Sequence, residues 1–496
     1  MNLLRLPTFY GVRQRVWAMN AVKLSFPILP SFFLLTLALT GCGSSSSPNS
    51  SGLTGNTSVT LIATSTANDQ LSEFLLSLTS LTLTNQAGAT VNIVPSPQSI
   101  EFMHLNGAAE PIVTTTIPQG VYTSATAIVG GAQFVCAGFN SSQNELQTST
   151  YAYGQTPPAQ VSVTLSPITI TGTAMGLSLD MLVSKSATFS ACAGPSTYAI
   201  NPTFSLAPIT FAAQPTNNTN GKFTALSGLI TSLSANGACL TVTAADGPVF
   251  SADCNSSTIF QGVSGVSALT TGLPVSLDAV TQSDGSLLAT RIAVQSTNTS
   301  DLNIWNGQMI AAYSSTSQFF TVAREQYGYL SASANYVGGQ PFSFGSATFQ
   351  ISSQLSNLES LPFTPSFTAT NLVAGQTVSV TTNVTGPQLP FAASTIQLIP
   401  QTLDGTITSI STSGSFTTYS ITLAPYDLFP DLVILPGQVS TLNTPNTVTV
   451  YIDTNTELLN TTVPAVGTLL RFTGLVFNDN GTLRMDCAQI NNGVAE

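Results

Sequence analysis

Short runs in which apolar and polar residues alternate dominate the chain from Ser58 onward. They are rich in Val, Ile, Thr and Phe, and Gly, Asn, Asp and Pro separate them, as in Ala159–Leu165 and Thr447–Ile452. An alternation with a period of two buries one face of a β-strand, so the pattern predicts strands. Helical periodicity is scarce, and the one short candidate, Asp69–Leu78, also fits the start of a strand. We therefore expect an all-β fold.

Two glycine positions recur three times after Gly221. The first glycine begins a Gly-x-Ile or Gly-x-Met motif and is expected to open a strand, and the second begins a Gly-x-x-Val or Gly-x-x-Leu motif. In chain order the pairs are Gly228 with Gly272, Gly307 with Gly375, and Gly405 with Gly467. A Thr-containing strand is expected inside each pair, at Thr258, Thr348 and 454–457, and a final strand holds Ile292, Ile396 or Ile490.

These copies differ in length, because the two glycines are 44, 68 and 62 residues apart. The coils of a solenoid would keep one length, so we predict three self-contained repeats, each a small β-barrel or sandwich. Their expected bounds are 222–297, 301–400 and 402–493. Gln214–Gly221 is full of turn-forming residues. This segment is expected to end an N-terminal β-sandwich-like domain at 58–214.

The first 41 residues have the features of a secretion signal. They hold four basic residues and no acidic one: Arg5, Arg13, Arg15 and Lys23. Their apolar run, Phe26–Leu39, has 14 residues, whereas a membrane-spanning helix needs about 20. The run ends in Leu39-Thr-Gly-Cys42, which resembles the lipobox of bacterial lipoproteins. Lipidation of Cys42 with removal of 1–41 is expected; the other interpretation is an ordinary signal peptide with a chance cysteine.

Residues 42–57 are rich in Ser and Gly and are expected to form a flexible tether spanning roughly 20 Å. Met19 is a second candidate start, because Met19–Gly41 is already a complete lipoprotein signal. Gly43, and not an acidic residue, follows the cysteine. By resemblance to the sorting rules of diderm bacteria, this favours the outer membrane. We expect a membrane-anchored lipoprotein, facing the periplasm or the cell surface.

The charge of the chain argues against a nucleic-acid partner. All 21 acidic residues follow Cys42, whereas only six of the ten basic residues do. Nucleic-acid binding needs a basic patch, and this composition does not supply one. Charged residues make up only 6% of the chain and hydrophobic residues 43%, which suits a secreted, folded β-protein.

The three repeats resemble a family of uncharacterised small β-domains, often repeated, in bacterial lipoproteins and secreted proteins. The likeness rests on the two glycine motifs, the Thr strand and a closing motif, which the first copy matches at Asp284–Ile292 and the third at Asn480–Leu483. The second copy departs from it at Gly386–Leu389 and has an aromatic insertion. Ser80–Gly88 and Ile117–Thr123 give the N-terminal domain a resemblance to another uncharacterised lipoprotein family. Both resemblances imply a fold and no catalytic site.

An exported protein can keep disulfides. Cys239 and Cys254 flank Asp246-Gly247 symmetrically, so a hairpin turning there places them opposite one another. Ala244 and Val249 are expected to close that hairpin as a hydrogen-bonded pair. Cys136–Cys192 is the simplest pairing for the N-terminal domain. Cys487 is expected to be a buried, free thiol.

No recognised catalytic set is present in the sequence. His104 is the single histidine, in an apolar, strand-like run, and is expected to be structural; neither a metal site nor a cofactor is expected. Asp427 and Asp431 are the nearest approach to the paired carboxylates of a glycosidase, and a solvated loop is the favoured alternative. Asp453–Glu457 lacks the glycine and remaining acids of an EF-hand loop.

An aromatic stretch in the second repeat is the best binding candidate. Tyr327, Tyr329 and Tyr336 could stack on sugars if their rings are exposed; the favoured alternative is that these aromatics pack the core of a longer β-unit. The leading hypothesis is a non-enzymatic, lipid-anchored envelope protein that acts as a β scaffold or binding module. The alternative is a glycan-binding or glycoside-active surface protein. Envelope proteins and cell-surface glycans are the expected partners besides the membrane.

Overall fold

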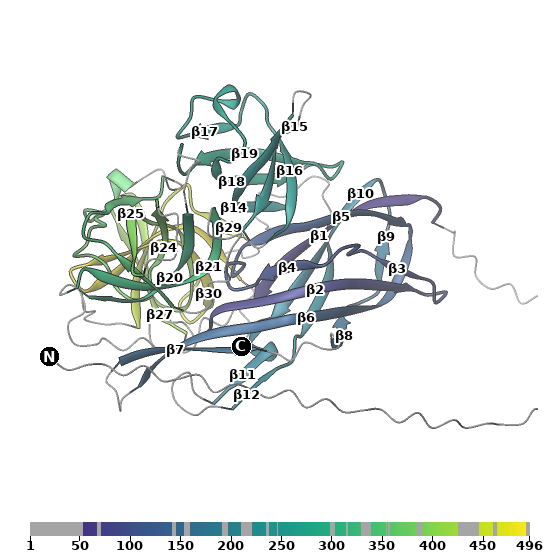
Figure 1. Ribbon diagram of the computed structural model, residues 1–496, viewed down its shortest axis with the longest axis horizontal. Helices are drawn as coiled ribbons and strands as arrows, with labels where there is room; N and C mark the ends of the chain where they lie inside the picture. The colour runs from purple at the N-terminus through teal and green to yellow at the C-terminus, as the bar shows by residue number, and fades with distance from the viewer. Residues whose placement is uncertain are drawn as a thin grey trace, which may run out of the picture. The chain divides into compact units, whose positions relative to one another are not determined.

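The computed structural model (Figure 1) describes most of the chain after residue 52. The described residues are 53–66, 71–140, 145–152, 159–190, 197–209, 221–234, 238–245, 247–297, 303–313, 316–328, 339–353, 355, 358–383, 389–424, 446–459 and 464–492. Nearly all their regular structure is β-strand, which confirms the predicted all-β fold. The helices among them are α1 (Val183–Ser186) and the 3-10 turns η1 (Val266–Ala268) and η2 (Leu358–Ser360). None of these is long and apolar enough to cross a membrane.

Long and short strands in mixed directions form the N-terminal domain. They are β1 (Asn56–Thr66), β2 (Leu71–Asn85), β3 (Thr90–Asn92), β4 (Gln98–Glu101), β5 (Ala109–Pro118), β6 (Gly120–Asn140), β7 (Glu145–Ala152), β8 (Ala159–Thr164), β9 (Ile168–Ile170), β10 (Ala174–Leu182), β11 (Ala187–Phe189), β12 (Tyr198–Ile200) and β13 (Phe204–Ile209). The main sheet runs β3-β2-β6-β8-β13-β10-β1-β5, with β4 on β2 and both β7 and β9 on β6. Figure 1 shows β2 and β6 side by side along most of their length.

The alternation along β2 explains why it is a strand. Leucines at every second position on either side of one irregularity are fully buried, namely Leu76, Leu78, Leu81 and Leu83. They pack with Phe74, Phe134 and Phe204 in the core of the domain. Burial of one strand face therefore determines the structure here, although the sequence at Asp69–Leu78 also has a weak helical pattern. Strand β2 begins at Leu71.

The three repeats form three sheets of the same topology. Barrel 1 contains β14 (Lys222–Leu233), β15 (Ala238–Ala244), β16 (Val249–Asp253), β17 (Ile259–Gln261), β18 (Pro274–Thr281) and β19 (Leu287–Val294). Barrel 2 contains β20 (Asn303–Tyr313), β21 (Gln318–Gly328), β22 (Gly339–Ser343), β23 (Thr348–Ile351), β24 (Thr377–Thr382) and β25 (Phe391–Leu398). Barrel 3 contains β26 (Gln401–Ser413), β27 (Phe416–Leu423), β28 (Thr447–Ile452), β29 (Glu457–Leu459), β30 (Leu469–Asp479) and β31 (Thr482–Asn491).

Each sheet closes into a five-stranded barrel. In barrel 1 the order β16-β15-β14-β18-β19 is closed by a parallel pairing of β16 with β19, and the short β17 adds to β19. Barrels 2 and 3 repeat this arrangement strand for strand, closed by β22–β25 and β28–β31. Four antiparallel pairings and one parallel closure are the topology of the OB-fold, a five-stranded Greek-key barrel. The expected barrel-like repeats are thus confirmed.

The recurring glycines join the first strand of each barrel to the turn before the fourth. The second glycine of each pair has a positive φ, and its N–H donates to the carbonyl of the residue two places after the first glycine. These bonds are Gly272 to Ile230 (2.7 Å), Gly375 to Met309 (2.7 Å) and Gly467 to Ile407 (2.8 Å). The first glycines were predicted to open strands. They lie instead inside β14, β20 and β26. At Gly228 and Gly307 the backbone of the neighbouring strand passes so close that a Cβ would collide with it, and at Gly405 a Cβ would meet the side chain of Ile421.

The Thr strand of the repeats also has a defined structural role. The Thr258 hydroxyl donates to the carbonyl of Ala289, and the Thr456 hydroxyl to that of Cys487, both at 2.8 Å. In barrel 2 the residue predicted for this role, Thr348, is exposed. Phe349 pairs with Ile396 as Phe260 pairs with Ile292 in barrel 1, and Thr258 lies two residues before Phe260, whereas Thr348 lies only one residue before Phe349. The equivalent residue is therefore Ala347, which cannot make this bond.

The hairpin of β15 and β16 carries the predicted disulfide. Cys239 and Cys254 are bonded, with their Cα atoms 5.1 Å apart. The predicted register is wrong by one residue: Thr243, and not Ala244, pairs with Val249. Ala244 instead begins the turn and donates its N–H to the carbonyl of Pro248. The shifted register still allows the disulfide because a bulge between Ala238 and Leu240 leaves Cys239 as the extra residue.

Replacing both Cys239 and Cys254 by serine is expected to lower the stability of barrel 1 by about 3 kcal/mol, because the bond closes a loop with a sequence separation of 15 and restricts the unfolded chain. Hydrogen exchange of the oxidised protein should show faster exchange in residues 222–294 and little change in residues 401–491. Unchanged exchange in barrel 1 would show that the bond does not stabilise it.

Candidate functional site

A tight turn between β4 and β5 presents His104. Glu101, at the end of β4, is 1% exposed, and its carboxylate accepts the backbone N–H groups of Phe74, Met103 and His104 at 2.8, 2.9 and 2.8 Å. These bonds hold the chain in a turn where the apolar run had suggested a strand. The sequence contains a signal for this turn, because an acidic side chain can accept the backbone N–H of the residue three positions later, as Glu101 does from His104.

His104 bridges two buried carboxylates. Its Nδ1 lies 3.2 Å from Oε2 of Glu101, and its Nε2 lies 3.2 Å from Oε2 of Glu110 in β5. Only 18% of its side chain is exposed. Burial alone would lower the pKa of His104, but the hydrogen bonds to Glu101 and Glu110 and the charge of Glu325 outweigh it and raise this pKa well above its ordinary value. The protonated form of His104, which can donate to both carboxylates, is therefore favoured.

A bulge in barrel 2 places two more charged residues at this cluster. Asn306 of β20 pairs with Glu325 and Gly307 with Ala323, so Arg324 is the extra residue of β21. A bulge re-aims a side chain, and Arg324 donates to the carbonyl of Ser72 in the N-terminal domain at 2.9 Å and to Oε1 of Gln308 at 2.9 Å. Burial raises the pKa of Glu325, whereas His104 and Asn306 act to lower it.

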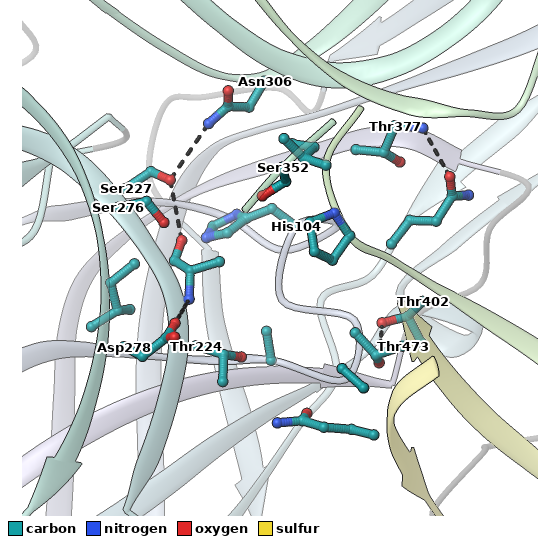
Figure 2. Close-up of a pocket in the computed structure, with 18 of the residues that line it drawn as sticks. His104, Thr224, Ser227, Ser276, Asp278, Asn306, Ser352, Thr377, Thr402 and Thr473 are labelled. Carbon is teal, nitrogen blue, oxygen red and sulfur yellow. Dashed lines mark hydrogen bonds between the residues drawn. The ribbon is translucent and has the colours of Figure 1, made fainter. Parts of the chain in front are cut away.

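A cavity of about 800 Å³ opens beside His104. The 103–110 turn of the N-terminal domain and all three barrels contribute to its lining. Figure 2 shows Asn306, Ser227, Ser276 and Asp278 along one side, Thr402 and Thr473 on another, and His104 between these walls and Thr377. Ligand sites of proteins commonly have about 300–1,000 Å³ and often lie where domains meet, so this is the candidate functional site.

Barrel 1 builds one wall as a continuous chain of hydrogen bonds (Figure 2). The Asn306 amide nitrogen donates to the Ser227 hydroxyl at 3.5 Å, which donates to the carbonyl of Ala225 at 3.1 Å. The N–H of Ala225 donates to Oδ1 of Asp278 at 2.9 Å, and Nε of Arg291 donates to Oδ2 at 2.6 Å. This network fixes the wall from barrel 2 through barrel 1.

Barrel 3 supplies the opposite wall through contacts with its neighbours. The Thr402 hydroxyl donates to the carbonyl of Asn106 at 2.8 Å and lies 2.9 Å from the Thr473 hydroxyl. The amide of Gln401 accepts the N–H of Thr377 at 2.9 Å. Lys222 of barrel 1 pairs with Glu457 at 2.9 Å. This wall therefore carries hydroxyl and amide groups together with the carboxylates of Asp453, Glu457 and Asp486.

Two acidic residues lie near the cavity, Asp453 in a turn and Asp486 in β31. Oδ1 of Asp453 accepts the N–H of Asn455 at 2.7 Å, and the N–H of Asp453 donates to the Thr456 hydroxyl, which makes a turn before β29. Burial and Asp453 raise the pKa of Asp486 to about 6. Within the part of the chain that the structure describes, no group of three or more His, Cys, Asp or Glu side chains could hold a metal ion.

The predicted aromatic platform is not supported at Tyr327. This residue is 3% exposed, packs with Ile304 and donates its hydroxyl to Gln295, so its ring cannot stack on a ligand at the surface. Other aromatics of the same stretch form the core of barrel 2, with the Trp305 and Phe342 rings 5.3 Å apart. The core interpretation holds for these residues. Tyr329 and Tyr336 lie outside the described residues.

The remaining predicted residues divide between described and undescribed parts of the chain. Cys136 is disulfide-bonded, but its predicted partner Cys192 lies outside the described residues, so that pairing remains a prediction. Cys487 is a buried free thiol, and burial raises its pKa. The carboxylates Asp427 and Asp431, the expected boundary at 214–220 and the lipidation candidate Cys42 also lie outside the described residues.

Comparison with known proteins gives a family match for one barrel and no function. A domain of unknown function (DUF5666) matches residues 227–293, which is most of barrel 1 and supports its resemblance to uncharacterised small β-domains. No curated protein matches the chain. One similar solved structure, from Drosophila and described as "drosophila Unr CSD456", is 12% identical, and the match covers 55% of this chain and 98% of that one with a TM-score of 0.13. A TM-score this low does not establish a shared fold.

Proposed function

We propose that the protein is a non-enzymatic, lipid-anchored envelope protein that binds a small ligand in the cavity beside His104. The observation that carries the proposal is the meeting of the 103–110 turn and all three barrels around one cavity of about 800 Å³, lined by both polar and apolar side chains. A scaffold without a ligand would gain stability by filling such a space with apolar side chains. Cys42 and the Ser-rich tether support the anchor.

Ligand binding is tested by filling the cavity. Thr224→Trp places a large ring among the lining residues, whereas Thr231→Trp adds the same ring to an exposed position of the same strand, β14, away from the cavity. The wild-type protein, incubated with the small-molecule fraction of a bacterial cell envelope, should retain a bound species in native mass spectrometry. Thr224→Trp should lose it and Thr231→Trp should keep it. If both variants retained the bound species equally, the ligand would bind outside this cavity. If the wild type retained no bound species, the proposal would be contradicted.

The anchor is tested separately from the ligand. Cys42→Ser is expected to abolish lipidation and to release the protein from the membrane fraction, because the thiol is the only atom of the lipobox that can carry the lipid. Mass spectrometry of the mature N-terminus and fractionation measure this. Continued pelleting of the variant, together with an unmodified wild-type N-terminus, would overturn the lipoprotein assignment and leave the cavity proposal standing.

A further inference from the structure

We infer that the cavity takes an organic ammonium ligand, an amine with an aliphatic body, and holds its charged nitrogen at Asp486; this rests on the proposed function and specifies the ligand of the same site. The inference depends on the charge balance of the lining, on one reachable carboxylate without a partner, and on the apolar part of the walls.

The lining of the cavity carries more carboxylates than cations. The carboxylates are Glu110, Asp278, Glu325, Asp453, Glu457 and Asp486, and the cations are His104, Lys222, Arg291 and Arg324. Carboxylates already hold three of these cations, His104 through Glu110 at 3.2 Å, Lys222 through Glu457 at 2.9 Å and Arg291 through Asp278 at 2.6 Å. An anionic ligand would have to break one of these ion pairs, whereas a cationic ligand supplies the charge that the lining lacks.

Asp486 is the carboxylate that lacks a partner. Its neighbours Met485 and Cys487 pack in the core of barrel 3, so the alternation along β31 directs Asp486 to the opposite face, where it lines the cavity. The residue is 7% exposed, yet no described residue donates a hydrogen bond to its carboxylate or forms an ion pair with it. The oxygens of this carboxylate keep accessible surface, so a group in the cavity can reach them.

Asp453 brings a second negative charge to the same place. The Thr456 hydroxyl donates to the carbonyl of Cys487 at 2.8 Å, which holds the 453–456 turn against β31 beside Asp486. Burial and the charge of Asp453 raise the pKa of Asp486 to about 6, so both disfavour its ionised form in the fold. Such a carboxylate costs the folded protein stability, and groups of this kind gather at functional sites. An ammonium group beside Asp486 and Asp453 would reverse this unfavourable charge balance.

The chemistry of the walls favours an ammonium group over other cations. A protonated amine donates several hydrogen bonds, and the carboxylates are acceptors for them. A quaternary ammonium has no N–H to donate and is usually held by aromatic rings, but Phe223 is the one Phe, Tyr or Trp among the described lining residues, and it is 1% exposed. The described residues also contain no group of three or more His, Cys, Asp or Glu side chains that could hold a metal ion. Aliphatic side chains such as Val294, Leu355 and Ile399 complete the lining and suit the methylene chain of an aliphatic amine.

The test uses the whole mature protein and calorimetry, with 1,5-diaminopentane and spermidine as probes. At least one is expected to bind with a Kd below about 1 mM, whereas hexane-1,6-diol, a neutral molecule of similar length, and choline should not bind. Asp486→Asn keeps the size of the side chain and removes its charge, and should weaken amine binding about tenfold or more. Without a ligand, this variant should fold at least as stably as the wild type at about pH 7.5, because it removes a buried charge that has no counter-ion.

Asp479→Asn is the matched control. Asp479 lies in β30 of the same barrel, pairs with Arg484 and is outside the lining, so its replacement should leave the Kd for the amines unchanged. Equal weakening by Asp479→Asn and Asp486→Asn, or undiminished binding by Asp486→Asn, would overturn the inference. Asp453→Asn is the second variant: its side-chain oxygen can still accept the N–H of Asn455, and the loss of its charge should weaken amine binding about threefold or more.

The outcomes separate this inference from the proposed function. Suppose that neither amine binds, while the wild type retains a species from the envelope fraction that Thr224→Trp loses. This result would overturn the amine inference and leave the binding proposal intact. Binding of hexane-1,6-diol as tight as that of 1,5-diaminopentane would also overturn the inference, because the charge would then play no part. Absence of binding by both amines, together with no retained species, would overturn both.

Discussion

Gly307→Ala is expected to destabilise barrel 2 by on the order of 4 kcal/mol. A Cβ at this position would lie 2.9 Å from Cα of Ala323 and 2.8 Å from the carbonyl carbon of Val322, and closer still to the oxygen of that carbonyl. These are backbone atoms of β21, so no side-chain rotation relieves the collision. Strands β20 and β21 would have to separate at the bulge that directs Arg324. Chemical denaturation followed by Trp305 fluorescence measures the loss, because Trp305 is buried in this barrel.

Gly345→Ala in the same barrel is the matched control. Its added Cβ would have no heavy atom within 4 Å, and Gly345 has no positive φ. This replacement should change the free energy of unfolding by less than about 0.5 kcal/mol. Similar losses in the two variants would show that close strand approach is not the reason for glycine at position 307.

The recurrence of the glycines was visible in the sequence, but their place in the barrel was not. Spacing alone identifies three copies, because Gly228, Gly307 and Gly405 recur with the same neighbours. It cannot distinguish a glycine that opens a strand from one that allows a neighbouring backbone to approach, since both require the absence of a side chain. The closing parallel pair β16–β19 joins residues more than thirty positions apart in the chain. No local pattern encodes such a pairing.

The candidate site was less predictable than the fold for a similar reason. Its walls come from Glu110, Ser227, Asn306 and Thr402, which are far apart in the sequence and individually unremarkable polar residues. His104 stands out in the sequence as the single histidine, but its partner Glu110 lies in the next strand and Glu325 lies in another barrel. The aromatic stretch of barrel 2 suggests a binding surface in the sequence, whereas in the structure Tyr327 packs between barrels 1 and 2 and bonds to Gln295.

His104→Ala is expected to destabilise the protein by on the order of 3 kcal/mol at pH 6, because it leaves the carboxylates of Glu101 and Glu110 buried without their counter-ion. The pKa of His104 is raised in the fold, so the folded state holds its proton more tightly than the unfolded chain. The stabilisation is therefore fully present below the unfolded pKa of about 6.5 and is lost as the pH rises through the higher folded pKa. Denaturation curves of wild type and variant, compared from pH 6 to pH 9.5, should converge at alkaline pH.

Variants of the charged residues around His104 are the controls for this prediction. Glu325 and Arg324 face the cluster from β21, so the histidine is not its only source of pH dependence, and the difference between wild type and variant is the informative quantity. In the double variant His104→Ala with Glu110→Gln, one uncompensated anion is gone, and part of the lost stability should return at pH 6. Glu110→Gln alone should instead destabilise, because it removes an anion that the protonated histidine requires. A difference between wild type and His104→Ala that stays constant across the pH range would mean that His104 is neutral in the fold, and its bridge to Glu101 and Glu110 would then be an ordinary pair of hydrogen bonds.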